Sequence, residues 1–254
     1  MKCEHEKCTR ARTYSRIINF SGGLSSALMT ILEYNQETDV VIFADTGREH
    51  PKTYKFLNDF ESFENIPITR IMYKNEFGKG FTALYTKKTI LPNRQFRTCS
   101  VELKINLATR YVRKTLGIKK MDWMVGFRAD EPNRVKTYDP IVKYKRPIFP
   151  LYKRGIMLED VYSYWATKPY TLEIPRILGN CDLCFLKGKD NIIKIMKHYP
   201  EMADKWIADE KRNGKNFIKG VSYSQLLKVA QSQKQLFELN DLQNAYPQCH
   251  CTQV

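Results

Sequence analysis

The chain has 254 residues, of which 43% are hydrophobic and 27% are charged, a composition typical of a soluble globular protein. No apolar run approaches the roughly 20 residues that a bilayer core demands, so we exclude a membrane partner. The 42 Lys and Arg residues exceed the 27 Asp and Glu residues and give a net charge of +15. This excess favours a polyanionic partner.

The N-terminal residues 1–16 are polar and carry Cys3 and Cys8 where a secretory signal needs an apolar stretch. We therefore expect a cytoplasmic protein. The chain has seven cysteines, an odd number in a reducing compartment. This count favours metal, cluster or thiol chemistry over a disulfide framework.

The first regular elements read as a strand, a glycine turn and a helix. A short apolar run over 17–20 ends at Ser21, Gly22 and Gly23, and apolar residues then recur at helical spacing. Residues 39–44 predict a second buried strand, followed by a helix that begins near Pro51.

Residues 66–73 and 123–127 predict two further strands, each separated from its neighbour by a segment long enough for a crossover. Residues 100–116 predict a helix that stops at Gly117. Strands that alternate with helices indicate an α/β fold with a parallel sheet covered on both faces.

The rest of the chain departs from this alternation. Residues 74–98, called the insertion below, are polar, contain glycine and proline, and are too long for a simple connection. Residues from 190 onward predict two or three helices. We divide the chain into an N-terminal tail (1–16), a nucleotide-binding domain (17–150) and a smaller, mostly helical C-terminal region (151–254).

The glycine turn is a candidate anion site. Glycines between a buried strand and a helix let the backbone approach a ligand while the first helical N–H groups point at it. Ser21, Ser25 and Ser26 add hydroxyl groups, so residues 21–26, called the serine loop below, are expected to hold a phosphate or pyrophosphate. The alternative is a tight turn with a serine cap.

A second polar turn supports the ligand interpretation. Asp45, Thr46 and Gly47 follow the neighbouring strand, and open parallel sheets bind ligands at the carboxyl ends of their strands. The serine loop matches neither the GxxxxGK(S/T) pattern nor the GxGxxG pattern.

The segments INFSGGLSSA and VIFADTGREHPKTYKFL resemble the PP-loop, or N-type ATP pyrophosphatase, superfamily, and within it the phosphoadenosine phosphosulfate (PAPS) reductase-like family, whose members are often encoded by phages. FRTCSVELK, GFRADEPNR, RPIFPL, EDVYSYW and GNCDLCFLK follow in the expected order. The resemblance covers roughly residues 17 to 213, and several separated matches are more specific than one glycine loop.

This resemblance implies an adenine nucleotide, such as ATP, on the serine loop. The implied nucleotide-binding residues are Ser21, Gly22, Gly23, Ser25, Ser26, Asp45, Thr46, Gly47 and Arg128. The usual superfamily loop is SGGxDS, whose acidic residue helps to hold Mg²⁺, and Ser25 stands at that position here. Asp45 is the candidate catalytic carboxylate and Mg²⁺ ligand in its place, and binding without metal is equally compatible.

Three cysteines are candidate ligands for a metal or a cluster. Cys181 and Cys184 form a C-x-x-C pair, whose spacing lets two thiolates converge on one ion. Cys99 precedes a predicted helix, where the helix N-terminus and nearby cations favour a thiolate. One alternative is structural zinc with Cys249, Cys251, Cys3, Cys8 or His198 as the fourth ligand, and others are a redox pair and an ordinary buried Cys99 thiol.

The family resemblance favours an iron–sulfur cluster among these interpretations of the cysteines. Related adenylylsulfate reductases hold a 4Fe–4S cluster with a Cys-Cys pair and a C-x-x-C, whereas this chain has Thr98 before Cys99. Three cluster ligands are therefore implied, as in PP-loop sulfur-transfer enzymes that leave one iron open. Cys249, near the chain end, is similar to the mobile catalytic cysteine of sulfonucleotide reductases, although the Glu-Cys-Gly setting is absent. The simpler interpretation of Cys249 is an exposed tail residue.

Basic residues suggest where anions bind. Arg128 and Arg134 follow a predicted strand, and their planar guanidinium groups suit phosphate or sulfate oxygens. We expect Arg134 and Lys104 to contact substrate, with a surface ion-pair cluster as the alternative. In residues 138–154, cations interleave with aromatic residues, a pattern that fits either tRNA or DNA or a solvated face.

These observations predict a PAPS reductase-like enzyme that performs iron–sulfur-dependent sulfur transfer, with a nucleic-acid base as the acceptor and a separate sulfur donor. One alternative is a sulfonucleotide reductase that uses a thioredoxin-like reductant and releases sulfite. The other is a non-catalytic nucleic-acid-binding module with structural zinc.

Overall fold

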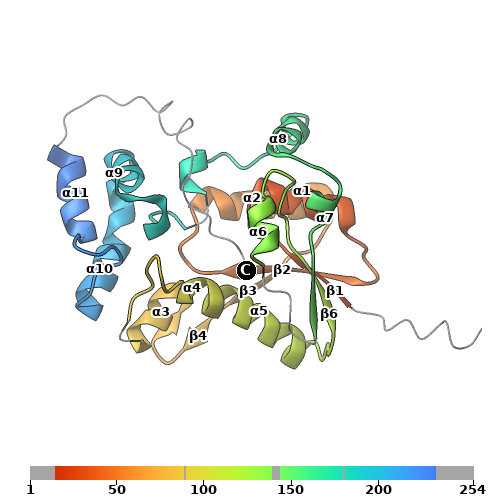
Figure 1. Ribbon diagram of the computed structural model, residues 1–254, viewed down its shortest axis with the longest axis horizontal. Helices are drawn as coiled ribbons and strands as arrows, with labels where there is room; N and C mark the ends of the chain where they lie inside the picture. Colours follow the sequence, from red (N-terminus) through yellow and green to blue (C-terminus); the bar gives the residue numbers. More distant parts are fainter. Residues whose placement is uncertain (1–14, 89, 139–143, 180, 233–254) are drawn as a thin grey trace, which may run out of the picture.

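In a computed structural model, residues 15–88, 90–138, 144–179 and 181–232 are described (Figure 1). Their centre is a five-stranded, fully parallel sheet with the strand order β3-β2-β1-β6-β7. The strands are β1 (Ser15–Asn19), β2 (Asp39–Asp45), β3 (Thr69–Met72), β6 (Met121–Met124) and β7 (Lys145–Ile148).

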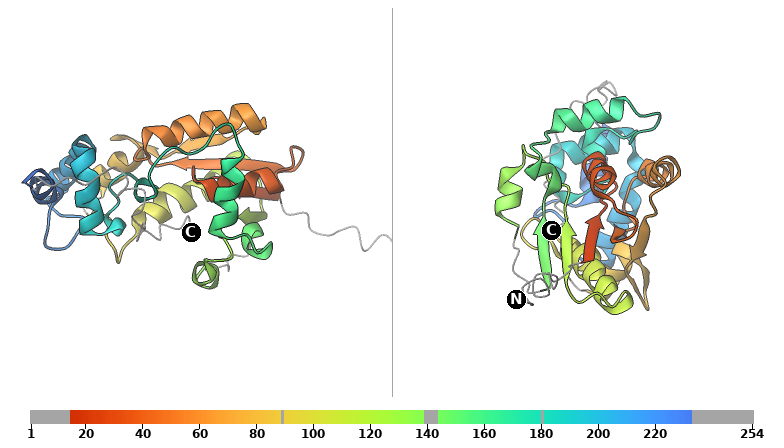
Figure 2. Two further views of the ribbon diagram at one scale, coloured as in Figure 1. Left: turned by 90° about the horizontal axis from the view of Figure 1, so that it is seen from above. Right: turned by 90° about the vertical axis from the view of Figure 1, so that its right-hand side faces the viewer.

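Helices cover both faces of this sheet, as Figure 2 shows from two further sides. One face packs against α1 (Leu24–Glu33), α2 (Pro51–Glu64), α7 (Pro150–Lys153) and α8 (Leu158–Ala166). The other face packs against a continuous helical segment made of α4 (Thr98–Ser100), η1 (Val101–Asn106), α5 (Leu107–Arg110) and η2 (Tyr111–Thr115). Neighbouring residues of β1 serve opposite faces, since Ile18 packs towards α1 and Ile17 towards α5.

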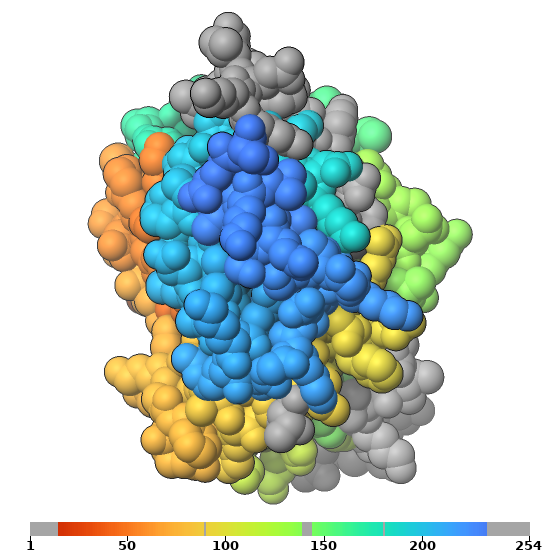
Figure 3. All heavy atoms as spheres, turned by 90° about the vertical axis from the view of Figure 1, so that its left-hand side faces the viewer, coloured from red at the N-terminus to blue at the C-terminus, as the bar shows by residue number. Residues whose placement is uncertain are grey.

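A second hydrophobic core lies at the other end of the molecule. It joins the helix of the insertion to the C-terminal helices, which Figure 3 shows in blue beside the orange and yellow insertion. The insertion contains β4 (Lys74–Asn75), β5 (Gly78–Lys79) and α3 (Gly80–Lys87). The C-terminal elements are η3 (Arg176–Leu178), η4 (Phe185–Lys187), α9 (Lys189–His198), η5 (Pro200–Met202), α10 (Ala203–Asn213) and α11 (Tyr223–Ser232).

The predicted α/β fold and parallel sheet are confirmed, with corrections at individual elements. The strands expected over 66–73 and 123–127 are shorter or shifted, and β7 and α3 were not predicted. In β7, Lys145, Arg146 and Pro147 replace the apolar residues that would indicate a strand in the sequence. Pro147 is tolerated because β7 pairs only with β6, at the edge of the sheet.

The helix limits follow local chemistry. The imidazole Nδ1 of His50 accepts the backbone N–H of Lys52 at 3.1 Å, which caps α2 one residue before Pro51. Gly117 has a φ of +70° and ends the segment that the sequence predicted as a helix over 100–116. Within the described ranges, every helix is too short or too polar to span a bilayer.

The domain boundary near Pro150 stays a prediction. Beyond this boundary, Leu151, Val161 and Trp165 pack in the same hydrophobic core as residues of the sheet and of α1. The indole Nε1 of Trp165 also donates to the carbonyl oxygen of Leu24 at 3.1 Å. Helices α7 and α8 therefore support the start of α1, where the candidate anion site lies.

Trp206 of α10 lies in the second hydrophobic core, and its substitution tests how much this core contributes to stability. It stacks on Tyr223, its ring lies 4.9 Å from that of Phe217, and its Nε1 donates to Asp182 at 2.8 Å. We expect Trp206→Ala to lower the free energy of unfolding by about 3–5 kcal/mol in urea titrations. Trp206→Phe should cost less, because the ring contacts remain. Equal losses for both variants would contradict the packing role.

Candidate functional site

The site lies at the point of the sheet where the strand order reverses, between β1 and β6. Strand β1 sits between β2 and β6, so the chain leaves β1 towards one edge of the sheet and later returns on the other side. Such a point opens a crevice at the carboxyl end of the sheet. The serine loop, the turn after β2 and the segment after β6 all lie at this edge (Figure 1).

Ser26 organises the serine loop. Its buried hydroxyl accepts the backbone N–H of Ser21 at 2.9 Å and donates to the carbonyl oxygen of Gly23 at 2.9 Å. The hydroxyl groups of Ser21 and Ser26 lie 2.8 Å apart. The loop is therefore held by its own side chains, and Ser26 acts as a brace rather than as an open ligand donor.

Gly22 is required by geometry. Its φ of +78° is a left-handed conformation, and a Cβ at this position would lie 2.7 Å from the Cγ2 atom of Thr53. The loop backbone therefore packs directly on α2. A side chain here would displace either α2 or the loop.

Helix α1 directs its N-terminus at the crevice. Its N-cap residue, Gly23, supplies no side-chain cap, and the first backbone bond runs from Ala27 N to Gly23 O at 3.1 Å. The N–H groups of Leu24, Ser25 and Ser26 precede this bond and have no acceptor within the helix. Together with the helix dipole, they form an environment that favours an anion.

Arg128 completes this environment from the segment after β6. Its Nη1 donates to the Ser25 hydroxyl at 3.2 Å, and its Nε and Nη2 each donate to the Asp130 carboxylate at 2.9 Å. Burial lowers the pKa of Arg128, but the Asp130 hydrogen bonds and the charge of Glu131 raise it above its usual value overall. Arg128 is thus a fixed cation beside the loop.

Gly126 lets this segment approach closely, since a Cβ there would lie 3.1 Å from the Cα atom of Ser26. Arg134, the other predicted arginine, is linked to Arg128 through Glu131, with which both form ion pairs. Its guanidinium carbon also lies 4.2 Å from the centre of the Phe127 ring. The structure therefore places Arg134 behind Arg128, where it supports the position of Arg128 through the shared carboxylate.

The turn after β2 is fixed by Asp45. One oxygen of this carboxylate accepts the backbone N–H of Gly47 at 2.7 Å and the hydroxyl of Tyr54 at 2.8 Å. Burial and this hydrogen bond raise the pKa of Tyr54, which therefore stays protonated and donates. The hydrogen bonds occupy Oδ1 of Asp45.

Thr46 connects the turn to the C-x-x-C segment. Its hydroxyl donates to the buried Glu49 carboxylate at 3.0 Å and lies 3.7 Å from the Cys181 sulfur. Glu49 and Cys181 are also paired through their backbones. Lys104 Nζ lies 4.0 Å from Glu49, whose pKa is raised by burial although Lys104 opposes this effect. Predicted residues from three segments thus meet around Glu49.

Arg48 anchors the same turn to the C-terminal helices. Its side chain is 2% exposed, forms an ion pair with Asp209 of α10, and donates to Thr82 at 2.9 Å. The guanidinium carbon lies 5.1 Å from the Phe81 ring centre and 5.2 Å from that of Trp206. Burial lowers the pKa of Arg48, while the Asp209 carboxylate opposes that shift.

The three predicted cysteine ligands lie around two buried tyrosines. Burial is the main cause that raises the pKa of Tyr85, and the charges of Cys99 and Cys181 add to it. Cys181 and Cys184 contribute in the same way to Tyr223. Cys99 and Cys181 also pack against the same hydrophobic core. The fold therefore brings the segment at Cys99 close to the distant C-x-x-C segment.

The ligand role of the three cysteines stays a prediction. Within the described ranges, no three His, Cys, Asp or Glu side chains form a group that could hold a single metal ion. The thiolates of a four-iron cluster bind different irons, so the cluster is a separate question. Cys3, Cys8, Cys249 and Cys251 lie outside the described residues, as does the proposed catalytic role of Cys249.

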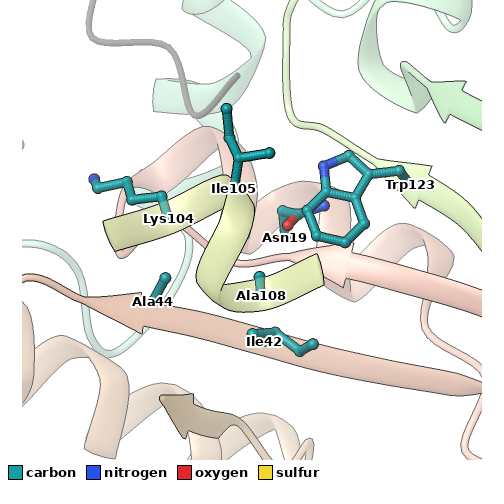
Figure 4. Close-up of a pocket in the computed structure, with 7 residues that line it drawn as sticks. All are labelled: Asn19, Ile42, Ala44, Lys104, Ile105, Ala108 and Trp123. Carbon is teal, nitrogen blue, oxygen red and sulfur yellow. The ribbon is translucent and has the colours of Figure 1, made fainter. Parts of the chain in front are cut away.

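A small pocket opens on the α5 side of the same sheet edge (Figure 4). Its polar groups are Asn19, at the end of β1, and Lys104, and the indole of Trp123 faces Asn19 across the pocket in the figure. The Asn19 amide donates to the Met124 carbonyl oxygen at 2.9 Å and ties β1 to β6. The pocket is lined by Asn19, Ile42, Ala44, Lys104, Ile105, Ala108 and Trp123.

The cations of residues 144–154 serve mainly intramolecular contacts. Arg146 binds Asp122 through two nitrogens at 2.7 and 2.8 Å, and Arg154 binds Glu33 at 2.6 Å. Lys145 Nζ lies 4.8 Å from the Trp123 ring centre, and burial lowers its pKa. This segment therefore offers less free positive charge than its sequence suggests, while residues 139–143 lie outside the described ranges.

Sequence reasoning missed Arg48, Glu49 and the bridging role of Glu131. Glu49 stands three residues after Thr46, the spacing that allows its carboxylate to fold back onto the Thr46 hydroxyl. That spacing was the available indication. For Arg48, the partner Asp209 is 161 residues away, so no local pattern points to the pair.

The family model "Phosphoadenosine phosphosulfate reductase domain" matches residues 15–169. The chain belongs to this family. The resemblance noted in the sequence is therefore confirmed. The matched residues include the serine loop, the turn after β2 and both arginines of the segment after β6.

The chain has relatives in a phage and in an archaeon. The chain is 31% identical over 201 residues to an uncharacterized nin region protein of Escherichia phage lambda, a match that covers 69% of this chain and 67% of that protein. It is 25% identical over 225 residues to an uncharacterized protein of Methanocaldococcus jannaschii, covering 84% of this chain and 52% of that protein. The chain thus spans about half the length of the archaeal relative.

Among solved structures, the chain is similar to a phosphoadenylyl-sulfate (PAPS) reductase from Candida auris, described as a phosphate complex. The TM-score is 0.44 and the sequence identity is 16%. The match covers 65% of this chain and 79% of the other.

The buried pair of Arg48 and Asp209 predicts a large effect on stability. Arg48→Met leaves the Asp209 carboxylate buried beside Arg212 alone, and we expect the free energy of unfolding to fall by about 3–5 kcal/mol in denaturant titrations. Lys55→Met is the control, because Lys55 forms an exposed pair with Asp59 at 2.7 Å. That pair should contribute less than about 1 kcal/mol. Similar losses for both variants would contradict the anchoring role.

Proposed function

We propose that this protein is an enzyme that binds the phosphate groups of an adenine nucleotide at the serine loop and performs sulfur chemistry beside it. The observation that carries the proposal is the convergence of the α1 N-terminus, the Ser25 hydroxyl and the Arg128 guanidinium on one crevice. Helix N–H groups and a fixed arginine are the donors that phosphate oxygens require. Membership of the PAPS reductase domain family supports the choice of nucleotide.

The reaction we favour is ATP-dependent sulfur transfer to a nucleic-acid base. An oxygen of the acceptor base attacks the α-phosphorus of ATP and pyrophosphate leaves. A sulfide-level sulfur from a separate donor then adds to the activated carbon, and AMP departs with the former acceptor oxygen. This sequence is redox-neutral, so it needs no reductant.

The residues of the site fit these steps. Arg128 and the α1 N-terminus would balance the negative charge on the phosphates and on the departing AMP. Asp45 has one oxygen held by Tyr54 and Gly47, and its other oxygen is the candidate ligand for a Mg²⁺ ion that would assist departure of pyrophosphate. Cys181 lies beside Thr46 on the same edge, where its thiol would border the path of the incoming sulfide without forming a bond to it.

An iron–sulfur cluster held by Cys99, Cys181 and Cys184 remains a separate proposal, and no step of the reaction is assigned to it. Iron content and visible absorbance of protein purified without oxygen test the cluster directly, since thiolate-bound iron clusters are coloured. One zinc ion per chain without colour would instead favour the non-catalytic module.

The second candidate is a sulfonucleotide reductase, which the family description favours. In that reaction, a protein thiolate attacks the sulfur of bound PAPS, and adenosine 3′,5′-bisphosphate leaves from an S-sulfocysteine. A thioredoxin-like dithiol then reduces this S–S bond, which releases sulfite and leaves the dithiol oxidised to a disulfide. Incubation with ATP, sulfide and tRNA or DNA, and separately with PAPS and thioredoxin, distinguishes the two reactions. Base thiolation detected by mass spectrometry supports transfer, and sulfite release without thiolation would reverse our preference.

Nucleotide binding gives the direct mutational test. We expect Arg128→Gln to weaken ATP binding in titration calorimetry by roughly ten- to a hundredfold, because a charged hydrogen bond to phosphate is lost. Arg154→Gln is the matched control. Arg154 is also paired with a carboxylate, but its partner Glu33 is the last residue of α1, at the end of the helix away from the serine loop. Equal affinities of the two variants would place the nucleotide elsewhere.

A further inference from the structure

The insertion is a strongly basic part of the described chain. Residues 74–98 carry a single acidic residue, Glu76. The cations of the same segment are Lys74, Lys79, Lys87, Lys88, Arg94 and Arg97. These 25 residues therefore supply five of the fifteen net positive charges of the whole chain, which makes the insertion a strong candidate for contact with a polyanion.

The β4–β5 hairpin presents an aromatic ring at its tip. Phe77 is 52% exposed, although apolar side chains of this size usually pack inside. The side-chain Oδ1 of Asn75 accepts the backbone N–H of Phe77 at 2.9 Å, and the side-chain Nδ2 of Asn75 donates to the Ala83 carbonyl oxygen at 2.9 Å. Asn75 therefore fixes the tip to α3 and holds the ring outward.

A second turn of the insertion repeats this arrangement. Phe96 is 62% exposed, and the Asn93 side chain accepts the backbone N–H groups of Gln95 and Phe96 at 2.9 and 3.0 Å. The Asn93 N–H in turn donates to the Phe96 carbonyl oxygen at 3.1 Å. Both aromatic tips are thus held in place by an asparagine rather than left to collapse onto the core.

Cations stand next to both rings. Lys74 and Lys79 flank the hairpin tip, and Arg94 lies within the second turn. All three are exposed, and within the part of the chain that the structure describes they form no ion pair with a carboxylate. Two separate rings bordered by exposed cations differ from a continuous apolar patch of the kind that binds another protein.

The insertion is fixed to the candidate site. The backbone N–H of Phe81, at the start of α3, donates to the Thr46 carbonyl oxygen at 2.8 Å. Gly80 permits this approach, because a Cβ there would lie 2.6 Å from the same oxygen. At its other end, the insertion runs directly into α4, which contains Cys99. A ligand on the insertion would therefore lie along the edge of the crevice.

We propose that the insertion binds a single-stranded nucleic acid, with bases stacked on Phe77 and Phe96 and phosphates bound by Lys74, Lys79 and Arg94. Exposed aromatic rings with neighbouring cations are the features by which proteins hold single strands, whose bases are free to stack. This inference rests on the proposed function, for which it supplies the acceptor, and it moves the expected nucleic-acid contact from residues 138–154 to the insertion.

The test is fluorescence anisotropy with labelled single-stranded DNA and RNA of about 15 nucleotides and with the corresponding duplexes. We expect Phe77→Ala and Phe96→Ala each to weaken single-strand binding about five- to tenfold, and duplexes to bind less tightly than single strands. Phe63→Ala is the matched control: Phe63 is 58% exposed but stacks on Tyr170 at 4.7 Å, on α2. Arg94→Gln should reduce the salt dependence of binding.

Several results would overturn the inference. They are absence of oligonucleotide binding, equal affinity for duplexes and single strands, equal effects of the Phe63 and Phe96 variants, and self-association through the tips in analytical ultracentrifugation. Thermal melts confirm that each surface variant is folded. Wild-type protein that binds ATP but no oligonucleotide overturns this inference alone. Weakened ATP binding with oligonucleotide binding intact, as we expect for Arg128→Gln, separates the two sites.

Discussion

The position of β1 in the middle of the parallel sheet is the constraint on which the site depends. Because β2 and β6 pair with opposite sides of β1, three segments far apart in the sequence emerge at one edge. Each segment contributes a different kind of group: helix N–H donors from the serine loop, a carboxylate from the turn after β2, and an arginine from the segment after β6. No single motif contains the anion site.

Close backbone packing turns this convergence into a defined geometry. Gly22 allows the serine loop to lie on α2, Gly126 allows the end of β6 to lie on Ser26, and Gly80 allows the insertion to lie on the turn after β2. Buried polar contacts then fix the orientation, with Ser26 bracing the loop and Arg48 joining the turn to α10. The second hydrophobic core thereby acts on the site through the backbone at Arg48, whose carbonyl oxygen accepts the N–H of Asp182.

The sequence predicted the parts of the site that depend on local chemistry. Apolar runs that end in glycine and serine located β1, β2 and the serine loop, and the spacing of leucines located the helix that follows Cys99. The sequence did not predict β7, whose edge position tolerates a proline, or α3, whose apolar residues pack in a core with residues far along the chain, such as Trp206 and Phe217. Ion pairs also escaped prediction, since Arg146 and Arg154 bind carboxylates on other elements. These two arginines therefore offer less positive charge to a nucleic acid than the basic and aromatic pattern of residues 138–154 indicates.

The amide resonances of the serine loop test the central claim most directly. In a titration of isotope-labelled protein with ATP followed by NMR, the N–H signals of Leu24, Ser25 and Ser26 should show the largest shifts, and the Arg128 side-chain signal should shift at the same ATP concentration. Saturable ATP binding that leaves these resonances unchanged and moves others would show that the phosphates bind at a different place.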